Sequence, residues 1–132
     1  MVNRQSFLKY ADHAKIDWGA AWEVESYNII EKQFMRLKKL SEKHKFSVII
    51  VAFPVAYQVY TTYIEDFPQN TISTIAKKYN FYFFDLLPLL RKHRDNKLFY
   101  DHCHPNDYSS EIIGKGLSKY LINDVFFNPP SF

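Results

Sequence analysis

The sequence has 132 residues, of which 47% are hydrophobic and 18% aromatic, a composition that fills an ordinary core and argues against disorder. This length gives room for one domain. The net charge is +3, and six Lys and Arg residues lie between positions 32 and 45. Such a run is typical of the solvated face of an amphipathic helix, and no nucleic-acid motif accompanies it. We therefore expect no nucleic-acid partner.

Three features narrow the class of protein further. Cys103 is the single cysteine, so no disulfide can form within the chain. The longest apolar run, 48–56, contains Pro54 and is far shorter than the roughly 20 residues that a membrane helix needs, so we expect no membrane span. Residues 1–5 lack the charged start and apolar stretch of a signal peptide, and the sequence leaves the compartment open.

The predicted elements begin with a helix. Residues 1–19 show no period and are expected to form an irregular lead-in to a single domain over 20–132. From Ala20, apolar residues recur every three or four positions opposite basic ones, which is the pattern of an amphipathic helix. This apolar stripe consists of Ile30, Phe34, Leu37 and Leu40.

Two apolar runs are expected to form parallel strands with a helix between them. Residues 48–53 are continuously apolar and rich in β-branched side chains, as in a strand buried on both faces, and Pro54 ends the run. After an irregular stretch rich in Tyr, a helix is predicted to begin at Pro68 and to stop at Asn80. Residues 81–84 predict the second strand.

The chain continues with a turn-like piece and a long helix. Asp85 closes the second strand and is expected to cap the turn-like piece at 86–91. The last helix is predicted over 107–122, with Asn106 as its N-cap. Gly114 lies beside its apolar stripe. Because a glycine inside a helix costs about 1 kcal/mol relative to alanine, it indicates close approach of this helix to the sheet.

This alternation of helices and strands predicts an α/β layered fold with a parallel sheet. Two strands are too few for such a sheet, because its faces must be covered and its edges closed. We therefore expect the sheet to be incomplete in this chain. The chain is then expected either to associate with itself or to be completed by an amino-terminal segment.

The loop at 99–106 carries the densest chemistry of the sequence. Pro105 biases His104 toward an extended conformation ahead of the last helix. Asp101, three residues before the histidine on a bent loop, can accept the Nδ1 proton, fix the tautomer and leave Nε2 as a base. The spacing therefore indicates the acid and the base of a Ser-His-Asp triad.

The loop resembles the last conserved block of the SGNH (GDSL-like) hydrolases, which reads D-x-x-H-x-N. Residues 48–53 and Phe84-Asp85-Leu86 resemble the two strands that precede this block, and the likeness covers about residues 20–123. It implies a three-layer α/β/α flavodoxin-like fold and a serine esterase or acyl-transfer activity that needs no cofactor. It further implies His104 and Asp101 as catalytic base and acid, and an acyl ester of a carbohydrate or lipid as substrate.

The other blocks of this family are missing. Its nucleophile lies in a G-D-S block near the start of the domain, and a glycine and an asparagine in two later blocks donate to the oxyanion. None of these blocks occurs in the chain. The resemblance therefore implies the carboxyl-terminal half of a hydrolase domain. The alternative is a truncated or degenerate module that is not catalytic and binds a glycan or a protein partner.

Other interpretations of these residues are weaker. His102 and Cys103 suggest a metal, but adjacent side chains are not expected to converge on one ion, so no metal is predicted. Cys103 is not predicted to be a nucleophile paired with His104, because neighbouring side chains on an extended loop point apart. Tyr57, Gln58 and Tyr60 follow the carboxyl end of a strand, where open α/β sheets bind ligands. They either line a substrate cleft or serve packing.

Overall fold

A computed structural model of the chain describes residues 19–62 and 66–127, so the expected lead-in lies outside the described residues except for Gly19. The elements in chain order are η1 (Gly19–Trp22), α2 (Val24–His44), β1 (Ile49–Ala52), α3 (Ala56–Tyr60), α4 (Phe67–Lys78), β2 (Tyr82–Asp85), α5 (Leu87–Arg91), α6 (Asp107–Tyr120) and η2 (Leu121–Phe126). Here η1 is a 3₁₀-helix and η2 a π-helix.

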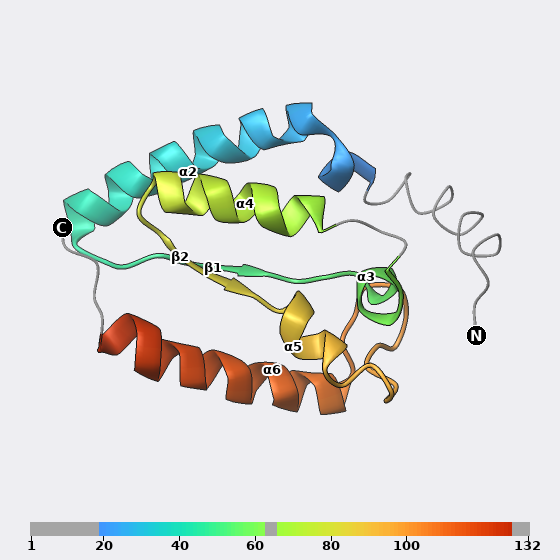
Figure 1. Cartoon of the computed structure of the whole chain (residues 1–132). Helices are drawn as coiled ribbons and strands as arrows, with labels where there is room; N and C mark the ends of the chain where they lie inside the picture. Colours follow the sequence, from blue (N-terminus) through green and yellow to red (C-terminus); the bar gives the residue numbers. More distant parts are fainter. Residues whose placement is uncertain (1–18, 63–65, 128–132) are drawn as a thin grey trace.

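The two strands pair in parallel, with Ile49 opposite Tyr82 and Ala52 opposite Asp85. Figure 1 shows α2 and α4 on one face of the sheet and α6 on the other. The chain between the strands, which contains α4, makes the crossover that a parallel pair requires. The predicted α/β class and the parallel pairing of these two strands are confirmed.

The prediction that residues 48–53 form a strand buried on both faces is wrong. In β1 only Ala52 is buried, and the other three residues are half-buried, as are all four residues of β2. In the part of the chain that the structure describes, the sheet has only two strands. Each strand therefore lies at an edge, where the flanking helices do not cover its side chains completely.

The helices follow the predictions with local differences. The turn η1 precedes α2, which begins at Val24 instead of Ala20, and Leu40 of the expected apolar stripe is 49% exposed. Asn80 ends the turn after α4 in the left-handed conformation, with φ of 57°. The short helix α3 was not predicted. None of the helices in the described segments is both long and apolar enough to cross a bilayer.

The close approach expected at Gly114 occurs at Gly116. A Cβ atom at Gly114 would meet nothing within 4 Å, whereas one at Gly116 would lie 2.5 Å from Cδ2 of Leu89 in α5. The prediction for Gly114 is wrong because residues two positions apart lie on nearly opposite sides of an α-helix. The glycine thus serves the contact between α6 and α5.

The main hydrophobic core lies where α3, α5 and α6 meet beyond the carboxyl ends of the strands. Its buried residues are Ala56, Val59, Leu86, Leu87, Leu90, Leu98, Phe99 and Ile113. Leu98 and Phe99 belong to the segment that leads into the 99–106 loop. The loop is therefore anchored directly in the core.

Candidate functional site

The segment 98–106 forms a narrow loop that is closed at its base by backbone hydrogen bonds. The N–H of Asn106 donates to the carbonyl of Leu98, and the N–H of Tyr100 donates to the carbonyl of His104, each at 2.9 Å. Because Leu98 is fully buried, the tip of this loop projects from a fixed base.

Asn106 joins this base to the start of α6. Its Oδ1 accepts the N–H of Ser109 at 3.0 Å, which confirms the predicted N-cap. Its Nδ2 donates to the carbonyl of Lys97 at 2.7 Å. The Ser109 hydroxyl is buried and donates to the carbonyl of Leu98. This serine therefore has a structural role and does not face His104.

A further hydrogen bond places the loop tip at one edge of the sheet. The N–H of Ala56, the first residue of α3, donates to the carbonyl of His102 at 2.8 Å. Since α3 follows the end of β1, the loop lies near the carboxyl ends of the parallel strands. This is the edge at which open α/β sheets bind ligands.

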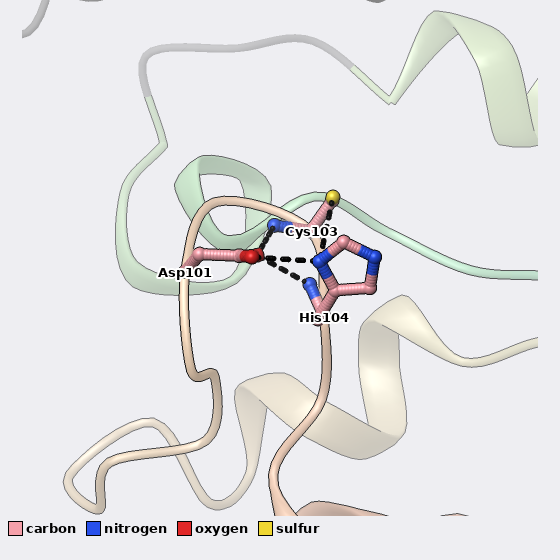
Figure 2. Close-up of side chains that lie close together, drawn as sticks. All are labelled: Asp101, Cys103 and His104. Atoms are coloured by element: carbon pink, nitrogen blue, oxygen red, sulfur yellow. Dashed lines mark hydrogen bonds and ion pairs between the residues drawn. The ribbon is translucent and has the colours of Figure 1, made fainter.

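Asp101 and His104 form the contact that their spacing predicts. Figure 2 shows the Asp101 carboxylate facing the imidazole, with Oδ2 at 2.7 Å from Nδ1. The other carboxylate oxygen, Oδ1, accepts the backbone N–H groups of Cys103 at 2.9 Å and of His104 at 2.8 Å. The loop backbone thus fixes the Asp101 carboxylate, and the fixed carboxylate in turn orients the His104 ring.

These bonds settle how the pair shares its proton. The backbone N–H of Cys103, then the ring and the backbone N–H of His104, hold the pKa of the Asp101 carboxyl far below its usual range. An ionised carboxylate only accepts hydrogen bonds, so Nδ1 carries the proton between the two groups. Nε2 points away from Asp101 (Figure 2), and no group in the described segments bonds it. Nε2 is therefore the basic atom of the pair.

The pair lies in solvent. The His104 side chain is 72% exposed and that of Asp101 48% exposed. Two cavities of about 380 and 370 Å³ lie along α5 and α6, where they share Leu89, Gly116 and Lys119, and neither is lined by the pair.

The structure corrects the expectation that Cys103 and His104 point apart. Cys103 Sγ lies 3.5 Å from His104 Nδ1, because the bonds to Asp101 Oδ1 turn the chain tightly between the two residues. The sulfur nevertheless lies on the Nδ1 side, where the proton is held for Asp101. Cys103 is not placed to give its proton to Nε2.

Two of the three residues considered for a substrate cleft have structural partners. Gln58 is 2% exposed, and its amide exchanges hydrogen bonds of 2.9 and 3.0 Å with Gln69 of α4. The Tyr60 hydroxyl accepts the N–H of Leu98 at 2.6 Å. These contacts are the packing roles that the sequence left open. Tyr57 is half-buried, and its place in a cleft stays a prediction.

Arg91 links three elements near the loop through hydrogen bonds that were not predicted. Its guanidinium bonds both carboxylate oxygens of Asp66 at 3.0 and 3.2 Å, and its Nε donates to the carbonyl of Gln58 at 2.9 Å. These bonds connect α3, α5 and the residue before α4. No local sequence signal marks a pair that is 25 residues apart.

Comparison of the chain with protein-family models, curated proteins and solved structures found no match. The resemblance to the SGNH hydrolases stays a prediction from the Asp101 to Asn106 loop and the strands before it.

Proposed function

We propose that this chain is the carboxyl-terminal half of an SGNH-type serine esterase or acyl-transfer domain, with His104 as base and Asp101 as the acid that orients it. The 2.7 Å contact between Asp101 Oδ2 and His104 Nδ1 carries the proposal. The loop at the carboxyl edge of a parallel sheet and the helices on both faces of that sheet (Figure 1) support the proposal. The proposed complete domain has a three-layer flavodoxin-like fold.

The reaction then needs a serine from an amino-terminal segment or a second polypeptide. Its hydroxyl attacks the acyl carbon of a carbohydrate or lipid ester while His104 Nε2 takes the proton, and Asp101 stabilises the imidazolium. His104 returns the proton to the leaving alcohol. A water molecule or an acceptor alcohol then attacks the acyl-enzyme, with Nε2 again as base, and the serine is regenerated.

The exposure of the pair supports a second candidate function. No serine in the described segments bonds His104, and both side chains of the pair are open to solvent. A non-catalytic module that keeps the loop and binds a glycan or a protein partner would show the same exposure of the pair.

The decisive experiment measures initial rates of p-nitrophenyl acetate hydrolysis. The chain alone is compared with the chain joined to any G-D-S segment that the reading frame ahead of Met1 encodes, or mixed with such a segment as a second polypeptide. We expect saturable hydrolysis only with the segment, because a base and its acid cannot form an acyl-enzyme without a hydroxyl. A reading frame without such a segment, or no activity after its addition, favours the second candidate.

Variants of the active assembly test the two assigned roles. His104→Ala should abolish most of the activity. Asp101→Asn should lower kcat about 10²- to 10⁴-fold, because an amide can hold the ring in the wrong tautomer. The matched controls are His44→Ala and Asp95→Asn, which lie on α2 and in the exposed 92–97 turn, and both should keep full activity. Activity that is indifferent to His104→Ala contradicts the proposal.

A further inference from the structure

Three side chains at the loop tip place different kinds of metal-binding atom close together. The Cys103 sulfur, one nitrogen of His104 and a carboxylate oxygen of Asp101 all lie within 4.8 Å of one another. Figure 2 shows the sulfur and the carboxylate gathered on the Nδ1 side of the imidazole ring. The convergence is local, since the backbone bonds of Asp101 Oδ1 fold the loop around it.

The separations of these atoms approach those around a tetrahedral zinc ion. Zinc bonds of about 2.3 Å to sulfur and about 2.0 to 2.1 Å to nitrogen place the two ligands about 3.5 Å apart at a tetrahedral angle. Cys103 Sγ and His104 Nδ1 already lie 3.5 Å apart. Asp101 Oδ2, at 2.7 Å from Nδ1, must move away by roughly 0.7 Å to reach the matching nitrogen to oxygen separation.

The donor set also selects the kind of metal. Thiolate and imidazole favour Zn²⁺ over Mg²⁺ and Ca²⁺, which prefer oxygen ligands alone. Asp101 Oδ1 is held by two backbone N–H groups, which leaves Oδ2 to turn from the ring to a metal. Hydrogen bonds of this kind orient ligating carboxylates in metal sites. Because the His104 side chain is exposed, water can take the fourth position.

We propose that Asp101, Cys103 and His104 bind one zinc-like transition-metal ion, and that this binding and the base function of His104 exclude each other. Coordination uses the lone pair of Nδ1, so the ring proton must move to Nε2, and Nε2 can no longer accept a proton. The thiol of Cys103 loses its proton to solvent when it becomes a ligand. Metal binding itself does not depend on the proposed esterase function, whereas its exclusion of the base function of His104 rests on that proposal.

Binding is tested on the chain itself, without any enzymatic assay. Titration calorimetry with Zn²⁺ should show one ion per chain, and the heat should change with the ionisation enthalpy of the buffer if the thiol releases its proton on binding. Co²⁺ in place of Zn²⁺ should show the charge-transfer absorption of a cobalt thiolate. Absence of stoichiometric binding, or binding without that absorption, overturns the proposal.

Four variants locate the site. Cys103→Ser, His104→Ala and Asp101→Asn should each weaken Zn²⁺ binding at least about tenfold, because loss of a ligand costs no less than loss of a group that only orients one. His102→Ala, the neighbour on the same loop, is the matched control and should keep the affinity. Affinity that is unchanged in Cys103→Ser places the ion elsewhere and overturns the proposal. Circular dichroism of each variant shows that the fold is kept.

Discussion

At the scale of single residues, two aspartates experience opposite surroundings. The Asp101 carboxylate accepts hydrogen bonds from two backbone N–H groups and the His104 ring, and its pKa is far below the usual value. Burial raises the pKa of Asp85, although its Oδ1 accepts the N–H of Leu87, the first residue of α5, at 2.9 Å. Loop geometry and burial thus shift the pKa values of two carboxyl groups of the same type in opposite directions.

Carbon-detected NMR of the two carboxyl groups between pH 2 and 7 tests this difference. Asp85 should titrate above the ordinary value of about 3.9, whereas Asp101 should remain ionised well below it. Because the folded pKa of Asp101 is depressed, its stabilising contribution is complete above the unfolded pKa, declines below it, and is lost once the pH has fallen through the folded value. Titration of Asp101 near 3.9 would contradict the observed hydrogen bonds.

At the scale of elements, the two glycines of α6 have different surroundings. Gly114 is exposed with open space beside it, whereas a Cβ at Gly116 would clash with Leu89 of α5. Both positions are helical, and neither glycine has a positive φ. The two glycines therefore share the same helical backbone conformation and differ only in the side chains packed against them.

Alanine substitutions should separate the two effects. Gly114→Ala should raise the free energy of unfolding by about 1 kcal/mol, the helix propensity difference. Gly116→Ala gains the same propensity but must displace Leu89, so it should be less stable than Gly114→Ala by about 1 to 3 kcal/mol. Urea unfolding of both variants measures the difference. Equal stabilities would mean that Leu89 moves aside at no cost.

At the scale of the whole molecule, the two edges of the sheet are not alike. On the side of β2, the Tyr82 hydroxyl donates a hydrogen bond to the carbonyl of Val125, and the backbone N–H of Phe83 donates one to the Tyr120 hydroxyl. The carbonyl of Val48, just before β1, accepts the N–H of Tyr82, and that of Ala52 accepts the N–H of Leu86, just after β2. The alternate residues of β1 therefore direct their backbone groups away from β2. Within the described segments, β1 has no second neighbour.

We expect the chain to hide this edge by self-association, because an unpaired strand edge with apolar side chains pairs readily. Phe53, directly after β1, is 58% exposed. Light scattering should show oligomers whose dissociation is promoted by Phe53→Lys. Ile29→Lys, at an equally exposed apolar position of α2, is the control and should leave the oligomers unchanged. A compact monomer that binds no hydrophobic dye would contradict this expectation.

The sequence alone was sufficient for the order of the two strands and the longer helices, for the parallel pair and for the contact between Asp101 and His104, but not for the short helix α3. Periodicity and turn residues act over a few positions, and the two site residues are three apart on a loop that Pro105 and Asn106 delimit. Tertiary structure decided the burial of Gln58 against Gln69 and the close approach at Gly116. These outcomes depend on which elements pack together, because each partner comes from a different helix.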